Sequence, residues 1–257
     1  MVSHQEKRGR KRKDHKQNTG NDDILTIRKY IEGQQYLVDD NNIVSTGSRA
    51  ICWAKKTLEI FNRVGIADKI INKGITWEVG RLFNGDDEVY SFNLLPEKGH
   101  KFPAFVNLQQ YYVEEFLIEK CMELSNFIDL RFSNEVVDHV QEPNDIKLSV
   151  RCPEGLYKME CEYLVACDGA DSPTRKRMGL SFEGEIFDEH FLIVDIHMEQ
   201  PPFEGVSPER WFWFTPSFHE GQSALLHKQA DNIYRIDLQL GEEVNREKEL
   251  DEKTVRK

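Results

Sequence analysis

The stretch of residues 161–184 constrains the fold of this chain more than any other part of it. It reads CEYLVACDGADSPTRKRMGLSFEG, and its apolar run at 163–167 is typical of a strand buried on both faces of a sheet. The run ends at Asp168 and Gly169, a pair that favours a sharp turn, and Pro173 suits the first turn of a helix. The sequence therefore predicts a buried strand, a tight turn and a helix.

This turn would present polar groups at the carboxyl end of a buried strand, where open α/β sheets bind their ligands. Asp168 can accept hydrogen bonds from ribose hydroxyls, Gly169 lets a ligand approach the backbone, and Arg175 can neutralise a phosphate. Turns made of Asp and Gly are common, so these residues alone leave open both a nucleotide site and an ordinary strand-to-helix turn.

Longer segments carry a family resemblance. CDGADSPTR at 167–175 matches the pattern DGxxSxxR, and GLSFEG after it fits the usual continuation. Together with VDDNNIVSTGSRAICWAKKTLEIFNRVG and FVNLQQYYVEEFL, these residues resemble the FAD-dependent aromatic-ring hydroxylases, flavoprotein monooxygenases of the p-hydroxybenzoate hydroxylase type. The resemblance covers residues 37–241 and is to the larger members that act on phenols, such as 3-(3-hydroxyphenyl)propionate hydroxylase.

The resemblance implies a mixed α/β chain with a glutathione-reductase-like, three-layer ββα FAD-binding domain. We expect that domain over residues 24–184, interrupted by a hairpin excursion at 75–105. Part of a mixed substrate-domain sheet would follow over 185–241, and a charged segment over 242–257.

The resemblance also implies a reaction. NAD(P)H would reduce FAD, the reduced flavin would capture dioxygen as a C4a-hydroperoxyflavin, and one oxygen would pass to a small phenolic substrate. Because the cofactor carries this chemistry, protein groups would bind, orient and exclude water, and no catalytic side chain is predicted.

The resemblance implies that seven residues contact FAD: Asp39, Arg49, Gln110, Val136, Asp168, Gly169 and Arg175. Asp40 could replace Asp39 at the ribose, and Gln109 could replace Gln110 at the flavin nucleotide. Without the resemblance, Asp39 reads as a solvated strand end, Gln110 as a solvated amide and Val136 as core.

The N-terminal part departs from the family pattern. Laying ILTIRKYI over the family's first helix puts Asn18, Gly20 and Asp23 at the three glycine positions of the phosphate-binding loop GxGxxG. Two side chains would then block close approach to the pyrophosphate, and Asp23 would repel it. The family's second flavin motif, a GD dipeptide, is also missing, because Gly85 and Asp86 lie in a predicted hairpin.

From these departures we expect an incomplete chain that binds FAD weakly and has impaired activity. The alternative is a non-catalytic remnant of a flavoprotein scaffold that acts through protein contacts.

Composition limits the partners. A net charge of −11 and a pI near 5.3 disfavour nucleic acid or an anionic membrane as a partner of the folded body. The exception is the basic segment 1–23, which we interpret as a disordered tail, with a nucleic-acid or localisation signal as the alternative.

No apolar run approaches the roughly 18 residues of a membrane span. Five cysteines without a CxxC pair favour neither a zinc site nor a disulfide framework, so we expect no metal and a cytoplasmic protein. Homo-oligomerisation is left open.

Periodicity predicts the remaining elements. A helix would begin after Ser48 and end near Gly65, and a second would run over 113–124. A hairpin would turn at Asn84 and Gly85. Short strands are predicted within 128–167 and at 191–198, 210–215, 223–229 and 233–240, with the aromatic residues 211–214 in the core.

Overall fold

The computed structural model describes residues 24–27, 33–47, 49–95, 97–185, 187, 189–200, 202–203, 205–219, 221–241, 244–251 and 253. These residues form two compact units. Unit 1 contains the described residues of 45–120 and 186–257, and unit 2 contains those of 24–44 and 121–185.

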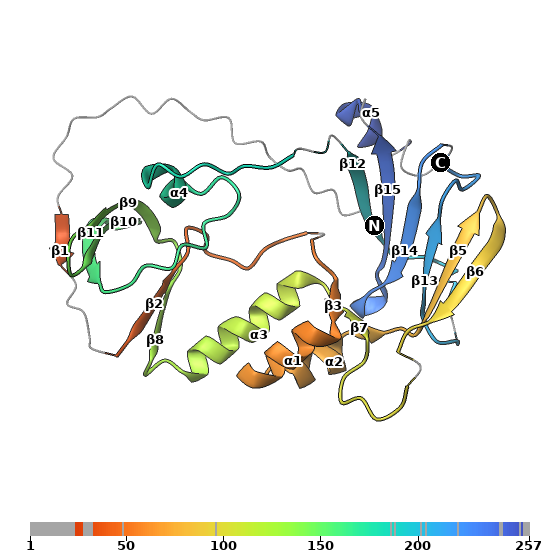
Figure 1. The fold of residues 1–257 in the computed structure, drawn as a ribbon, viewed down its shortest axis with the longest axis horizontal. Helices are drawn as coiled ribbons and strands as arrows, with labels where there is room; N and C mark the ends of the chain where they lie inside the picture. The colour runs from red at the N-terminus through yellow and green to blue at the C-terminus, as the bar shows by residue number, and fades with distance from the viewer. Residues whose placement is uncertain are drawn as a thin grey trace. The chain divides into compact units, whose positions relative to one another are not determined.

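Unit 1 is built on a six-stranded sheet in the order β12-β15-β14-β13-β5-β6 (Figure 1). Its strands are β5 Val79–Asn84, β6 Asp87–Asn93, β12 His190–Ile196, β13 Glu209–Trp213, β14 Ala224–Lys228 and β15 Tyr234–Gly241. Strand β5 pairs with β13 in parallel, and the other neighbours are antiparallel. The predicted hairpin is confirmed, because β5 and β6 meet at Gly85, whose φ of 61° suits glycine. The predicted strands after residue 190 are confirmed as well.

A small sheet, three longer helices, a 3₁₀ turn and a short helix complete the described part of unit 1. The sheet has the order β3-β7-β4, with β3 Cys52–Ala54, β4 Ile75–Thr76 and β7 Phe105–Asn107. The helices are α1 Lys55–Val64, α2 Ala67–Lys73 and α3 Gln110–Glu123, whose last turn belongs to unit 2. A 3₁₀ turn η1 Ala230–Asn232 and a short helix α5 Arg246–Glu249 follow.

The first predicted helix ends as expected but begins later. Gly65 ends α1 with a left-handed φ of 83°. Residues 52–54, expected inside the helix, instead form β3, because Cys52 pairs with Asn107 and the Trp53 indole N–H donates to the Leu108 carbonyl at 2.8 Å. The predicted cap Ser48 lies outside the described residues.

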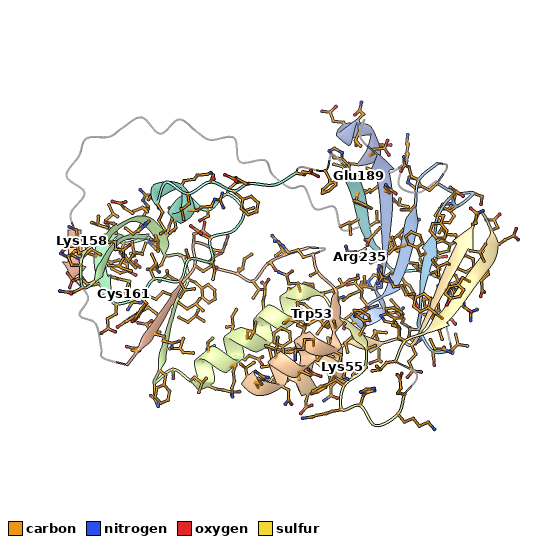
Figure 2. The ribbon with its side chains drawn as sticks, in the orientation of Figure 1. Trp53, Lys55, Lys158, Cys161, Glu189 and Arg235 are labelled. Carbon is orange, nitrogen blue, oxygen red and sulfur yellow. The ribbon has the colours of Figure 1, made fainter. Side chains whose placement is uncertain are left out.

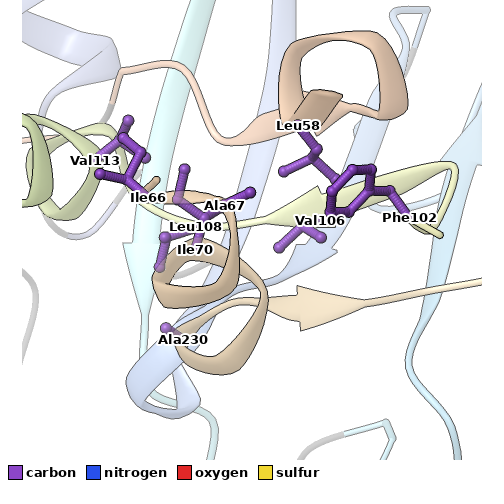
Figure 3. Close-up of a cluster of buried hydrophobic side chains, with 9 residues drawn as sticks. All are labelled: Leu58, Ile66, Ala67, Ile70, Phe102, Val106, Leu108, Val113 and Ala230. Atoms are coloured by element: carbon purple, nitrogen blue, oxygen red, sulfur yellow. The ribbon is translucent and has the colours of Figure 1, made fainter. Parts of the chain in front are cut away.

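Apolar side chains from these helices and from β7 form one core (Figure 3). Its buried members are Leu58, Ile66, Ala67, Ile70, Phe102, Val106, Leu108, Val113 and Ala230. A second cluster covers one face of the large sheet and includes Phe203, Leu226, Tyr234, Trp211 and Trp213. Burial of these faces is the main force that holds unit 1 together.

Unit 2 is a meander beside a small parallel sheet. Its elements are β1 Ile24–Ile27, β2 Gln35–Val38, β8 Ile128–Arg131, β9 Glu135–Gln141, β10 Ile146–Cys152, β11 Gly155–Cys161 and α4 Pro173–Arg177. Strands β9, β10 and β11 are antiparallel, which confirms the predicted meander, and β2 pairs with β8 in parallel. Leu148, Val150, Tyr157 and Met159 form its core.

Two predictions for unit 2 are wrong. Residues 24–27, expected to begin a helix, form a strand that pairs with β11, as three β-branched residues in four favour. The run 163–167 is not a buried strand, since Tyr163 and Val165 are 85% and 83% exposed. No strand pairs with it in the described part of the chain, and only Leu164 packs against the core of unit 2.

In the part of the chain that the structure describes, no helix is long and apolar enough to cross a membrane, and no group of side chains is arranged to hold a metal ion. All five cysteines lie among these residues and are free thiols.

Candidate functional site

The turn after residue 167 is closed by its own side chains. Asp168 accepts hydrogen bonds from the Ser172 hydroxyl at 2.5 Å and from the Thr174 amide at 3.0 Å. Ser172 in turn accepts from the Arg175 amide at 3.0 Å and caps α4. The predicted turn and helix are therefore present, and Asp168 lies with Arg175 on one short motif.

The Asp168 carboxylate is held strongly in its charged form. Partial desolvation acts to raise its pKa, but the hydrogen bonds from Ser172 and Thr174 outweigh this effect and lower the pKa to about 2.

Acidification should break the hydrogen bonds that Asp168 accepts in this cap as the pH falls from about 4 towards about 2. Because the folded pKa is lower than the ordinary value of 3.8, Asp168 stabilises α4 above about pH 4, and that contribution disappears as the pH falls towards about 2. We expect the ¹³C signal of the Asp168 carboxyl and the amide signal of Thr174 to titrate together in this range. In Asp168→Asn the Thr174 signal should not titrate there. A midpoint at or above 3.8 would show that the cap is absent.

The turn still has donor groups and open space that could accept a ligand. The Arg175 guanidinium donates to the Ala170 carbonyl at 2.7 Å through one of its nitrogens and lies over the Phe182 ring at 5.1 Å. Its other N–H groups have no partner in the described part of unit 2. Gly169 has a φ of 82°, and no atom lies within 4 Å of the position where a β-carbon would stand.

Asp39 and Val136 lie at one edge of unit 2, beyond the carboxyl ends of the parallel strands β2 and β8. The Asn134 amide donates to the Asp39 carbonyl at 2.9 Å, which joins the loops that follow the two strands. The carboxylate of Asp39 accepts through Oδ1 from the amide and side chain of Asn41, while Oδ2 has no partner among the described residues. Asp40 is exposed, and Val136 packs against the core as a side chain.

Arg177 connects α4 to this edge. Its guanidinium donates to the Val137 carbonyl and lies 3.8 Å from the Asp138 carboxylate on β9. Five of the predicted residues, Asp39, Val136, Asp168, Gly169 and Arg175, therefore belong to one connected part of unit 2.

The other two predicted residues, Arg49 and Gln110, belong to unit 1, where Gln110 contacts the backbone of Ala50, the residue next to Arg49. The Gln110 side chain accepts from the Ala50 amide at 3.4 Å and donates to Glu114 at 2.6 Å. Burial acts to raise the pKa of Glu114, but bonds from Ser45 and Gln110, and the charge of Arg49, lower it overall. The alternative Gln109 is buried and donates to the Ala230 carbonyl at 3.1 Å, which uses one of the two N–H groups of its amide.

Unit 1 also contains a cavity that sequence reasoning missed. It has a volume of about 350 Å³, within the usual range for small-molecule sites. Its walls include Trp77, Phe92, Phe105, Arg210, Phe212 and Leu225. The aromatic run 211–214 was predicted to be core, but residues on a strand alternate between faces. Trp211 and Trp213 pack in the core of the sheet, whereas Phe212 lines the cavity on the opposite face.

Pairing across the sheet explains which residues share the cavity face. Arg210 lies opposite Gly80, and Gly80 lies opposite Phe92. A β-carbon on Gly80 would stand 2.3 Å from the Phe92 ring, so glycine is needed for that ring to cross β5. Trp77 stacks on Phe105 with centroids 5.7 Å apart, so the two rings cover part of each other's faces and form one aromatic side of the cavity.

Comparison with known proteins identifies the family. A model described as "FAD binding domain" matches residues 32–256. The chain is 37% identical over 115 residues to 12-dehydrotetracycline 5-monooxygenase/anhydrotetracycline 6-monooxygenase of Streptomyces rimosus, covering 43% of this chain and 22% of that protein. It is 24% identical over 167 residues to 3-(3-hydroxy-phenyl)propionate/3-hydroxycinnamic acid hydroxylase of Mycolicibacterium gilvum, covering 65% and 29%.

Solved structures agree on the fold. The chain superposes on p-nitrophenol 4-monooxygenase PnpA from Pseudomonas putida with a TM-score of 0.71 and 19% identity, covering 86% of this chain and 53% of that one. Aklavinone-11 hydroxylase in complex with FAD and aklavinone gives 0.65 and 16%, covering 80% and 41%. The predicted mixed α/β fold of the flavin-dependent monooxygenases is thereby confirmed.

The chain spans 22% and 29% of the lengths of these two curated relatives. Across that span the family model, the relatives and the fold all agree with the resemblance in the sequence. The chain therefore belongs to the FAD-binding domain family that includes the flavin-dependent aromatic hydroxylases.

Proposed function

We propose that this chain has the function of an FAD-dependent monooxygenase that hydroxylates a small aromatic compound, with NAD(P)H as the reductant. The observation that carries this proposal is the aromatic-walled cavity on the large sheet of a chain that belongs to an FAD-binding family. A cavity with flat apolar walls favours an aromatic ring over a flexible or strongly polar ligand.

The residues present fit parts of FAD. The free Oδ2 of Asp39 can accept a ribose hydroxyl, and the remaining donors of Arg175 can bind a phosphate. The space beside Gly169 lets the ligand approach the backbone. In unit 1, the exposed Arg49 can bind the flavin nucleotide, while Gln110 supports the loop that carries Arg49. The positions aligned with the glycine loop, Asn18, Gly20 and Asp23, lie outside the described residues.

In the proposed reaction the protein positions the ring and excludes water. Bound FAD would supply the redox chemistry by which one oxygen atom of dioxygen enters the ring. Phe92, Phe105 and Phe212 would contact the ring and exclude water from the cavity. Trp77, which is only 3% exposed, would support Phe105 by stacking on it.

Two observations favour a second candidate, a scaffold that does not bind FAD tightly. Tyr163 and Val165 are exposed, although both side chains are of the kind that a flavin domain would bury. In addition, the Asp168 carboxylate is already satisfied by Ser172 and Thr174. Such a scaffold would act through protein contacts.

A flavin titration separates the two candidates. We expect the purified chain to quench FAD fluorescence on binding, and Asp39→Ala or Arg49→Gln to weaken binding about tenfold, or about 1.4 kcal/mol. The matched control Arg151→Gln changes an exposed arginine of β10 and should leave the affinity unchanged. No quenching by the unmodified chain at millimolar FAD would support the scaffold, and NAD(P)H oxidation that depends on an aromatic compound would exclude it.

A further inference from the structure

Glu114 ties the segment of residues 45–50 to helix α3. One of its carboxylate oxygens accepts from the Ser45 amide at 2.6 Å. The other accepts from the Ser45 hydroxyl at 2.5 Å and from the Gln110 side chain at 2.6 Å. The described residues of segment 45–50 form no helix or strand, so the place of this segment depends on such side-chain bonds.

Glu114 also sets the direction of the Gln110 amide. Burial acts to raise the pKa of Glu114, but the bonds from Ser45 and Gln110 lower it overall, so at neutral pH the side chain is a carboxylate that can only accept. Gln110 lies one turn earlier on α3 and must therefore direct its NH₂ group to the carboxylate. Its amide oxygen is then directed to the Ala50 amide, 3.4 Å away. Glu114 thus acts directly on one end of segment 45–50 and through Gln110 on the other.

Arg49 is held by its backbone and not by its side chain. Its carbonyl accepts from the Arg235 guanidinium, and its neighbour Ala50 donates to Gln110. The Arg49 side chain is exposed, and in the described part of the chain it makes no hydrogen bond or ion pair. A guanidinium on a fixed backbone loses less conformational entropy on binding an anion than one on a mobile loop. The bonds around Arg49 therefore prepare it for an anionic ligand.

We propose that Glu114 is a positioning residue for a flavin nucleotide. By holding segment 45–50 in place, it presents the Arg49 guanidinium to a phosphate of the ligand. The inference rests on the proposed function in taking FAD as that ligand. Both carboxylate oxygens are occupied by bonds from Ser45 and Gln110, so Glu114 acts on the ligand through these residues.

Variants of Glu114 give the first test, in which FAD binding to the full chain is followed by flavin fluorescence. We expect Glu114→Ala to weaken binding about fivefold and Glu114→Gln about threefold, because glutamine presents an NH₂ group to a donor that now bonds the carboxylate. A carboxylate near Arg49 also repels a phosphate. If that repulsion dominated, Glu114→Gln would bind FAD more tightly, which would overturn the proposal. The matched control Glu115→Ala removes an exposed carboxylate of the same helix and should leave the affinity unchanged.

A double-mutant cycle shows whether Glu114 acts through Arg49. Arg49→Gln alone is expected to weaken FAD binding about tenfold, and adding Glu114→Ala should weaken it by no more than about twofold further. If Glu114 supported only the general stability of unit 1, adding Glu114→Ala would still weaken binding about fivefold. That additive result would overturn the proposal.

Two NMR measurements without FAD keep this inference separate from the proposed function. In Glu114→Ala the ¹⁵N order parameters of the Arg49 and Ala50 amides should fall, and in Glu115→Ala they should not. Inorganic pyrophosphate, followed by the Arg49 Nε–H signal that Arg49→Gln assigns, should bind Glu114→Ala less tightly than the unmodified chain. Unchanged order parameters or an unchanged pyrophosphate affinity would overturn the inference.

The outcomes for the two proposals are distinct. If the unmodified chain binds no FAD, the proposed function is refuted, and the NMR measurements still decide the role of Glu114. If the chain binds FAD and Glu114→Ala binds it as tightly, this inference alone is refuted. Glu114→Gln takes the place of Glu114→Ala in every comparison if the alanine variant does not fold.

Discussion

Replacing Arg235 with methionine should lower the free energy of unfolding of unit 1 by about 3–5 kcal/mol. Arg235 lies on β15, is labelled in Figure 2, and is only 8% exposed. Its guanidinium donates to Asp237 at 2.5 Å and to the Arg49 carbonyl. Burial acts to raise the pKa of Asp237, but bonds from His227 and Arg235 lower it, so the carboxylate is charged in the folded chain.

Without Arg235 the Asp237 carboxylate would have only His227, 3.6 Å away, as a partner. Burial keeps the pKa of His227 low, so that partner is neutral near pH 7 and cannot balance the charge. The cost of Arg235→Met is therefore mainly the cost of a buried, uncompensated carboxylate. The Arg49 carbonyl would also lose its donor.

Urea unfolding followed by tryptophan fluorescence measures this effect. Trp53, Trp77, Trp211 and Trp213 are the four tryptophans of the chain, and all belong to unit 1. The double variant Arg235→Met with Asp237→Leu should be more stable than Arg235→Met alone, because it also removes the stranded charge. The control Arg151→Met should change stability by less than about 0.5 kcal/mol. If the double variant lost as much as the sum of its single changes, the buried charge would not be the cause.

Local signals in the sequence were enough for many elements. Asn84 and Gly85 specify the turn of the hairpin, and Gly65 specifies the end of α1, because each needs only the backbone preference of one or two residues. The cap of α4 is equally local, since Asp168, Ser172 and Thr174 are neighbours in the chain.

Features that depend on distant partners were predicted less well. The run 163–167 has the composition of a buried strand, but burial requires neighbouring strands, and none pairs with it in the described part of the chain. Likewise, Cys52 begins a strand and not a turn of helix because Asn107, far along the chain, pairs with it. Composition contains no information about such partners.

The candidate site shows the same difference between local features and features that depend on distant residues. The motif around Asp168 was found from the sequence, although its contacts to a nucleotide remain a prediction. The cavity was missed because Arg210 belongs to a strand whose two faces are assigned only by its pairing with β5 and β14. Alternation along 210–214 could have shown that Phe212 and the core tryptophans lie on opposite faces of the strand. It could not have shown that Phe212 and Phe105 line the same cavity.

Replacing Trp77 with alanine should lower the free energy of unfolding by about 3–5 kcal/mol and remove binding of aromatic ligands to the cavity. The side chain is 3% exposed, stacks on Phe105, and donates from its indole N–H to Asn107 at 3.1 Å. Truncation would leave a large void between β4 and the cavity, which these rigid strands cannot close.

Two variants identify what Trp77 contributes. Trp77→Phe keeps a ring but loses the N–H donor, and because Asn107 Oδ1 also accepts from the Cys52 thiol at 3.3 Å, it should cost about 1 kcal/mol and keep measurable binding. Tyr90→Ala removes a ring of similar size that is 61% exposed on β6, and it should cost about 1 kcal/mol or less. Unfolding by urea gives the stabilities, and naphthoate titration followed by ligand NMR gives the affinities. If Trp77→Ala bound naphthoate as tightly as the unmodified chain, the aromatic side of the cavity formed by Trp77 and Phe105 would not be part of the binding site.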